Sequence, residues 1–295
     1  MEDNLTVLYC LVDDFCKEVI PTWKKTLLES SMKKRDRNGQ LSESEIMTIY
    51  IHFHQSHYRD FKNYYINYVS KHLTNLFPQL VCYHRFIALI KSVLVPLCFF
   101  LQCFSGEKTG IYFIDSTPIK VCHIKREKQH RVFKGLAQKA KSTIGWFFGF
   151  KLHLVINDKG ELMAFSITTA NVDDRKPAVN LVKTLIGKLI GDKGYISKKL
   201  SATLLGQGLN LITKVKKNMK NCFMPLVDKL LLRKRAIIEC VNDQLKNISQ
   251  IEHTRHRSVW NFLANILAAL IAYSLQPKKP SIKCDVQQLI SVPYP

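Results

Sequence analysis

Two adjoining segments near the middle of the chain alternate between apolar and polar residues, and this pattern constrains the fold more than any other feature. The segments are WFFGFKLHLVIND and GELMAFSITTA, and the connection between them is Asn157-Asp158-Lys159-Gly160. Alternation with a period of two predicts β-strands, and this connection has the composition of a hairpin turn. The chain must therefore contain an antiparallel strand pair.

Further short apolar segments extend this pair into a larger sheet. GIYFID (110–115) precedes the hairpin and predicts a third strand. After the hairpin, the patterns predict a helix at 178–187, a strand ending in KLIGDKGY, a helix near SKKLSATLLGQG and a strand at NLITKVKK. A long helix at 231–246 and an apolar helix at 259–275 follow. Three meandering strands and later helical crossovers predict an α/β fold with a mixed sheet flanked by helices.

The first hundred residues have helical spacing instead. One predicted helix must end before Pro21, and Ser42 with Glu45 forms a capping box that opens another. We therefore predict an all-α N-terminal domain at 1–105, a catalytic domain at 106–280 and a tail at 281–295. The helical domain could hold a helix-turn-helix that binds DNA ends, and a plain supporting bundle is an equally open alternative.

The chain is strongly basic, with 44 Lys and Arg against 23 Asp and Glu and a formal net charge of +21. Such a charge favours nucleic acid as partner, because Lys and Arg that neutralise phosphates release bound counterions, and this release favours binding. The nine cysteines form no CxxC pair and no zinc spacing, which indicates reduced thiols in a cytosol. The longest apolar runs, 89–104 and 259–275, are shorter than a standard membrane span, so we expect two buried helices and no membrane partner.

Two segments concentrate the positive charge. Residues 120–141 hold eight Lys and Arg and one acid, Glu127, and residues 214–220 hold four lysines. Either segment could be a solvated loop. Because both flank the acidic residues described next, they favour a nucleic-acid channel. Trp146 could stack on an extruded base, but we expect a core role for it.

Two carboxylates follow predicted strands: Asp115 after IYFI and Asp192 after KLIG. Sites in α/β sheets collect at the carboxyl ends of strands, so these two would lie close together if their strands are neighbours. Adjacent, unpaired aspartates repel each other, and a divalent cation is the natural remedy. Either residue could instead organise a turn, because Asp115 precedes Ser-Thr-Pro and Asp192 precedes Lys-Gly.

A third carboxylate, Glu239, lies on the helix predicted for 231–246. At about 100° per residue, Arg235, Glu239, Asn242 and Lys246 form one stripe beside an apolar face. This stripe could point along the sheet edge toward the two aspartates. The simpler alternative is an i,i+4 ion pair between Arg235 and Glu239, which contributes only about 0.2–0.5 kcal/mol.

The segments FIDST, GDKGY and RAIIE, each around one of these carboxylates, resemble the Asp-Asp-Glu triad of bacterial insertion-sequence transposases. Arg235, Glu239 and Lys246 match the Y-x2-R-x3-E-x6-K signature of many such enzymes, with Leu232 in place of the tyrosine. FKGLAQ, GWFFGFKLHLVINDKGELMAF, NVDDRKP and NDQLKNISQIEHTRHRS extend the resemblance, over nearly the full chain, to the 982 group of insertion sequences.

The resemblance implies a ribonuclease H-like catalytic domain in which Asp115, Asp192 and Glu239 are the catalytic residues and hold two Mg²⁺ or Mn²⁺ ions. It implies that Arg235 and Lys246 hold DNA phosphates. Further DNA contacts are expected from cations in the basic segments and near the strand ends: Lys193, Lys151, Arg131 and Lys134.

The function implied is DNA transposition. The enzyme would cut double-stranded DNA at the element's terminal inverted repeats and transfer the 3′ ends into target DNA. We expect a homodimer on paired ends, in the bacterial cytoplasm and on the nucleoid. A ribonuclease H-like nuclease without strand transfer and an inactive DNA-binding repressor copy are the alternatives, and the three intact carboxylates argue against the second.

Overall fold

The computed structural model describes residues 2–30, 39–142, 145–215, 219 and 223–282 of the chain. Most of the basic segment 214–220 and of the predicted tail lies outside these residues. The chain divides into two compact units. We call Met1–Phe104 with Gln244–Gln276 the helical unit, and Ser105–Asp243 with Pro277–Pro295 the sheet unit.

The helical unit consists of short and long helices that enclose an aromatic core. Tyr50, Phe53, Phe61, Tyr64 and Phe86 are all almost fully buried in it. Its elements in chain order are α1 (Glu2–Glu29), α2 (Glu43–Gln55), α3 (Phe61–Tyr64), the π-helical turn η1 (Tyr65–Val69), α4 (Ser70–His72), α5 (Tyr83–Leu89), the 3₁₀ turn η2 (Ile90–Val93), α6 (Leu94–Gln102) and α11 (Val259–Ser274).

The structure divides the chain differently from the predicted 106–280 domain, because α11 belongs to the helical unit. There α11 packs against α2 and α6. Asn261 links α11 to two other parts of the unit. Its side-chain Nδ2 donates to the carbonyl of Ile87 at 2.9 Å, and its backbone carbonyl accepts from the Tyr50 hydroxyl at 3.3 Å. A helix that is apolar on all sides needs cover on all sides, and the other helices supply it.

The prediction that the first helix ends before Pro21 is wrong, because α1 continues through Pro21 to Glu29. The inward-facing residues of α1 end at Ile20, so the turns after the proline lie at the surface. They are held by Lys24, whose ammonium lies 2.9 Å from the Glu43 carboxylate at the start of α2. The Ser42–Glu45 capping box is confirmed.

The apolar run predicted at 89–104 belongs to a longer helical stretch, Tyr83–Gln102. By length and composition alone this stretch is long and apolar enough to cross a membrane. Core helices of globular proteins pass the same test. Phe86, Ile90, Val93, Leu97 and Phe100 are buried along it, within the helical unit.

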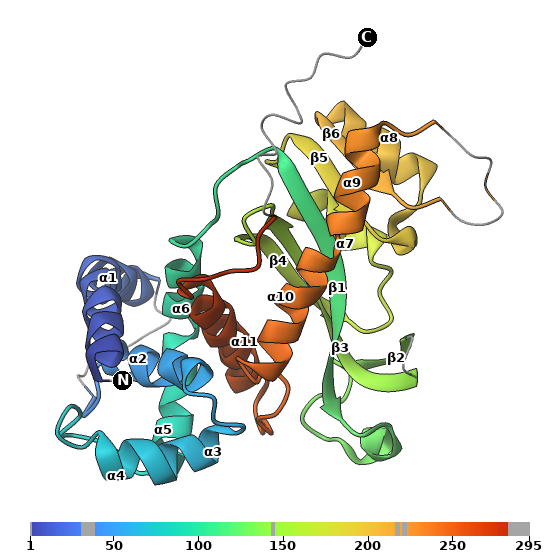
Figure 1. The fold of residues 1–295 in the computed structure, drawn as a ribbon. Coiled ribbons are helices and arrows are strands. Elements are labelled where there is room, and N and C mark those ends of the chain that lie inside the picture. The colour runs from blue at the N-terminus through green and yellow to red at the C-terminus, as the bar shows by residue number, and fades with distance from the viewer. Residues whose placement is uncertain (1, 31–38, 143–144, 216–218, 220–222, 283–295) are drawn as a thin grey trace. The chain divides into compact units, whose positions relative to one another are not determined.

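The sheet unit is built on a six-stranded mixed sheet with the order β2-β3-β1-β5-β6, and β4 pairs with β3 (Figure 1). The strands are β1 (Ile111–Cys122), β2 (Gln138–Ser142), β3 (Gly145–Asn157), β4 (Leu162–Thr169), β5 (Gly187–Gly191) and β6 (Leu209–Thr213). β3 is antiparallel to β1, β2 and β4, whereas β5 and β6 continue the sheet in parallel. This order agrees with the ribonuclease H-like fold class that the sequence predicted.

The predicted hairpin turn joins β3 to β4. The Asn157 side-chain oxygen accepts from the backbone N–H groups of Lys159 and Glu161, and Gly160 adopts a φ of +73° that favours glycine. Because these contacts fix the turn, they fix the register in which β3 and β4 pair.

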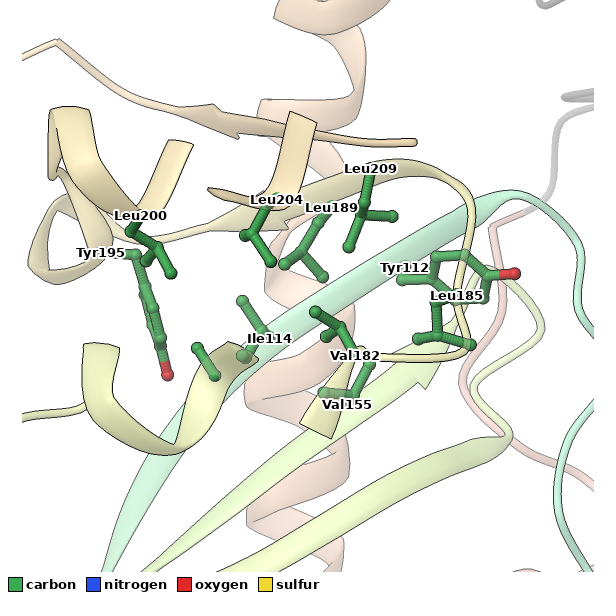
Figure 2. Packing of buried hydrophobic residues seen from close by; sticks show 11 residues of the cluster. Tyr112, Ile114, Val155, Val182, Leu185, Leu189, Tyr195, Leu200, Leu204 and Leu209 are labelled. Atoms are coloured by element: carbon green, nitrogen blue, oxygen red, sulfur yellow. The ribbon is translucent and has the colours of Figure 1, made fainter. Parts of the chain in front are cut away.

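Helices cover both faces of this sheet. On one face, α7 (Arg175–Leu181) and α8 (Lys198–Gly206) bury a cluster that includes Tyr112, Ile114, Val155, Leu189 and Leu204 (Figure 2). On the other face lie α9 (Leu226–Lys234) and α10 (Ala236–Asn247), which cross β1 in Figure 1. The helix predicted as continuous over 231–246 is therefore two helices that meet at Arg235.

Candidate active site

The paired strands β1 and β5 bring the two aspartates side by side. The parallel register pairs Ile111–Phe113 with Lys188–Ile190, and its continuation by two residues places Asp115 beside Asp192. Neighbouring strands are about 4.8 Å apart, so the two carboxylates occupy adjacent positions. β1 itself continues to Cys122. The pairing of β1 with β5 ends at Phe113, two residues before Asp115. The prediction that the strand itself ends at Asp115 is wrong.

Glycines make room for this arrangement in the GDKGY segment. A Cβ on Gly191 would come within 3.4 Å of Tyr195 and Ile114. After Asp192, the chain turns so sharply that the backbone N–H of Gly194 donates to the Asp192 Oδ1 at 2.7 Å. Asp192 thereby caps a single 3₁₀ turn, η4 (Lys193–Tyr195).

Burial and neighbouring charges raise the pKa of Asp115 to about 6. Burial is the largest cause, and the negative charges of Asp192 and Glu239 act in the same direction. The nearby Arg235 guanidinium and a hydrogen bond from the Ser116 backbone oppose the rise. The Asp115 carboxylate therefore carries negative charge that its own surroundings only partly compensate.

Glu239 lies in the first turn of α10 and pairs with Arg235 one turn before it. Its side chain is 55% exposed, whereas that of Arg235 is only 19% exposed. The same guanidinium reaches toward Asp115, with Arg235 Nη1 3.9 Å from Asp115 Oδ1. Arg235 thus stands between the glutamate and the aspartate, and the i,i+4 ion pair considered from the sequence is present.

Asn242 is a functional candidate that the sequence had placed on the stripe without giving it a role. Its Nδ2 donates to Asp115 Oδ2 at 3.1 Å, and the residue is only 8% exposed. Its side-chain carbonyl oxygen is buried and has no hydrogen-bond partner within the described part of the chain. The spacing could have revealed this, because Asn242 follows Glu239 by three residues on the same helical face.

The chemistry of these groups fits a divalent cation. Asp115, Asp192 and the unpartnered carbonyl of Asn242 offer oxygen ligands only, which is the type that Mg²⁺ and Mn²⁺ prefer. Within the part of the chain that the structure describes, no three His, Cys, Asp or Glu side chains lie close enough together to hold one ion. Glu239 is directed to Arg235 instead.

A second polar cluster lies on the opposite face of the sheet, beneath α7. Lys151 donates from its Nζ to Asp174 at 2.8 Å and to the Val172 carbonyl at 2.9 Å. His153, fully buried two residues along the same strand face, bonds to the Thr168 hydroxyl at 2.8 Å. Lys151, expected to contact DNA, therefore lies on the face away from Asp115 and is held by an ion pair.

Tyr195 lies between these two groups of residues. Its side chain is part of the buried cluster (Figure 2). It is 1% exposed, and among the described residues its hydroxyl has no hydrogen-bond partner. Burial raises the pKa of Tyr195 above its ordinary value, and the negative charges of Asp174, Asp115 and Asp192 add to the rise. The hydroxyl therefore stays protonated and is available as a donor.

The remaining expected DNA contacts have different surroundings. Lys193 is exposed directly beside Asp192, and Arg131 and Lys134 are exposed between β1 and β2. Lys246, in the last turn of α10, belongs to the helical unit, where its Nζ lies 3.6 Å from Glu252. Of the expected cations, Arg235 and Lys193 are thus the two placed next to the carboxylates.

The expectation of a core role for Trp146 is wrong. Trp146 is 57% exposed, whereas Phe147 and Phe148, which follow it on β3, are 3% and 6% exposed. Trp146 is the second residue of β3, and its exposure reflects its place at the start of the strand.

A family model described as the transposase DDE domain matches residues 105–259. Two solved structures are similar in part. A piggyBac transposase synaptic complex with hairpin DNA has 11% identity and a TM-score of 0.48, covering 92% of this chain and 74% of that one. The Mos1 mariner paired end complex with Mn has 10% identity and a TM-score of 0.24, covering 91% and 94%. No curated protein matches in sequence.

Proposed function

From the premise that this chain belongs to the family of transposase DDE domains, we propose that it cuts DNA at the terminal inverted repeats of an insertion sequence. It then joins the freed 3′ ends to target DNA. The observation that carries the proposal is the pair Asp115 and Asp192, which adjacent parallel strands hold side by side. The family match, which spans more than half of the chain, includes both residues and Glu239.

Asp115, Asp192 and Glu239 would hold the metal. Two Mg²⁺ or Mn²⁺ ions would supply the Lewis acidity and charge stabilisation that phosphodiester hydrolysis and strand transfer require. The chain's own residues prepare for this. Asn242 orients the Asp115 carboxylate through its Nδ2, and the rigid strand pair fixes the spacing of the two aspartates.

Glu239 completes the set only if its side chain leaves Arg235. The Glu239 side chain is exposed, so its rotation away from Arg235 meets little obstruction. Once released, the Arg235 guanidinium has a fork of N–H donors that suits a DNA phosphate. The proposed roles of Glu239 and Arg235 are therefore linked. The two side chains would have to separate before Glu239 could bind metal and Arg235 could bind a DNA phosphate.

DNA is the partner that the charge supports. The formal net charge of +21 favours a polyanion, and eight exposed Lys and Arg side chains lie in the segment 120–141 of the sheet unit. We place the protein in the bacterial cytoplasm on nucleoid DNA, as a homodimer when two element ends are paired.

The test uses purified full-length protein and labelled duplexes that carry the terminal inverted repeats flanking its gene. With Mg²⁺ or Mn²⁺, a denaturing gel should show nicks at the repeat ends and, with added target DNA, joined products. Asp115→Asn should bind the repeats and cut none. Cleavage without joining would show a nuclease that lacks strand transfer. Binding without cleavage in either metal would refute the proposal that the protein is an enzyme.

A further inference from the structure

The tip of the β2–β3 hairpin carries an exposed aromatic ring on a rigid support. Trp146 is the second residue of β3, and its register partner on β2 is Lys141. The residues after it, Phe147 and Phe148, are buried, so the backbone that carries the indole ring is fixed in the sheet. More than half of the Trp146 surface nevertheless faces solvent.

Two lysines lie beside this ring, and one of them, Lys139, also lies 3.9 Å from the Glu127 carboxylate. The Lys139 Nζ lies 5.2 Å from the Trp146 ring centroid, and Lys141 stands across from Trp146 on the neighbouring strand. Every Lys and Arg between Lys120 and Lys141 is exposed, and Glu127 is the one acid in that stretch of sequence. A cation beside an aromatic face matches a nucleotide, which presents a flat base next to a phosphate.

The segment before the hairpin is fixed to the sheet rather than loose. Phe133 is 2% exposed, packs edge-on against Phe150 at 5.6 Å and stacks on His130 at 5.5 Å. The Ala137 N–H donates to the Phe133 carbonyl at 2.9 Å, just before β2 begins. Arg131 and Lys134 are therefore carried on a folded backbone, so that only their side chains lose freedom on binding.

We propose that Trp146 stacks on an unpaired nucleobase at a DNA end, while Lys139 and Lys141 hold the adjoining phosphates. The inference rests on the proposed function, whose reaction produces DNA ends. Inside a duplex both faces of each base are stacked, so an indole ring finds a free face only on a terminal, frayed or extruded base. Two copies of this hairpin that faced each other would repel, because both carry the same positive charge.

The experiment measures binding by fluorescence anisotropy without divalent metal, so that no cleavage occurs. Full-length wild type, Trp146→Ala and Trp146→Phe are titrated with a blunt duplex and with the same duplex carrying a short single-stranded overhang. Trp146→Ala should bind the overhang DNA about tenfold more weakly, with blunt-duplex binding almost unchanged, and Trp146→Phe should retain most of the affinity.

Trp260 offers a matched control. It is 49% exposed and also has a lysine beside its ring, with Lys91 Nζ 5.9 Å from the centroid. Trp260→Ala should leave the preference for overhang DNA intact. In a variant that keeps Trp146 alone, made by Trp23→Phe and Trp260→Phe, the overhang DNA should quench the indole fluorescence and the blunt duplex should not.

Equal weakening of blunt and overhang binding by Trp146→Ala, or no quenching, would overturn the inference. A change in sedimentation of the DNA-free Trp146→Ala protein would also overturn it, because the ring would then belong to a protein interface. Failure of the proposed function is distinguishable. A protein that cuts no repeat DNA but still discriminates overhangs through Trp146 would refute the transposase chemistry and leave this inference standing.

Discussion

Glu239 and Asn242 lie one turn apart on α10, and each is engaged with a different member of the site. Glu239 contacts Arg235, whereas Asn242 contacts Asp115. In the proposed mechanism, Glu239 changes its partner for the site to act, whereas Asn242 keeps its contact with Asp115. This difference predicts different consequences for the two substitutions.

Glu239→Gln preserves the size of the side chain and its hydrogen bond to Arg235 but removes the charge needed to hold a cation. We expect the cleavage rate on inverted-repeat DNA to fall by more than about 100-fold, with DNA affinity unchanged. Asp243→Asn, a change at an exposed carboxylate of the same helix, is the control and should cut normally. Near wild-type cutting by Glu239→Gln would return Glu239 to an ordinary helix ion pair.

Asn242→Ala removes the donor to Asp115 and leaves the aspartate free to rotate. A hydrogen bond to a charged group contributes about 1.5–3 kcal/mol, so we expect cleavage to slow by roughly 10–100-fold. The affinity of the protein for Mn²⁺, measured by calorimetry, should fall as well. Cys240→Ala, exposed on the same helix, should change neither quantity. Equal Mn²⁺ affinity in Asn242→Ala and wild type would contradict a positioning role.

At the level of the elements, the contact between β1 and β3 sets the geometry on which Asp115 depends. Gly149 on β3 comes so close to β1 that a Cβ there would overlap the Ile119 carbonyl oxygen. The strands cannot keep their register around any larger residue. The long antiparallel pairing from Tyr112 to Cys122 therefore requires glycine at this position.

Gly149→Ala should lower the free energy of unfolding by about 3 kcal/mol, at the upper end of overpacking costs, because the obstacle is backbone. Gly206→Ala is the matched control: a Cβ at the end of α8 would meet nothing within 4 Å. That substitution should be neutral or stabilise slightly, by up to about 1 kcal/mol. Urea unfolding of both variants measures the difference, and equal midpoints would contradict the close approach.

The elements also show what the sequence could and could not predict. Period-two patterns and the Asn157–Gly160 turn located the strands, because both are local signals. The sequence does not show that the helix continues past Pro21, because the ion pair that supports its last turns joins Lys24 to Glu43 of another helix. The proximity of Asp115 and Asp192 depends on which strands are neighbours in the sheet, and local patterns do not give this. The exposure of Trp146 likewise depends on how the rest of the fold packs around its strand.

For the whole molecule, buried histidines make stability depend on pH. In the helical unit, burial lowers the pKa of His52 and His54 to about 4 and that of His256 to about 3. His54 bonds through Nδ1 to the Ser249 carbonyl at 2.5 Å, and no described residue forms a hydrogen bond with its other ring nitrogen. These rings are neutral in the folded state.

In the unfolded chain the same histidines bind protons below a pKa of about 6.5. Because the folded pKa values lie lower, the unfolded state holds more protons in between. The contribution of these neutral histidines to the free energy of unfolding is therefore complete above pH 6.5. It should fall by a few kcal/mol in total as the pH is lowered toward 4. Thermal unfolding followed across this range measures the loss.

His54→Gln should reduce the slope of stability against pH between 6.5 and 4. His72→Gln replaces an exposed histidine of the same unit and should leave the slope unchanged. If both variants keep the wild-type slope, carboxylates and not the buried imidazoles govern the acid response.

The return of the chain to the helical unit has a consequence for how the protein is made. Helix α11 forms part of the core of that unit, but it is synthesised only after the whole span from Ser105 to Ser258. At about 5–20 residues per second, the first helices wait roughly 10–30 s for their last partner. During that time the sheet unit has emerged almost completely. The N-terminal helices therefore complete their core only after all the strands of the sheet have been synthesised.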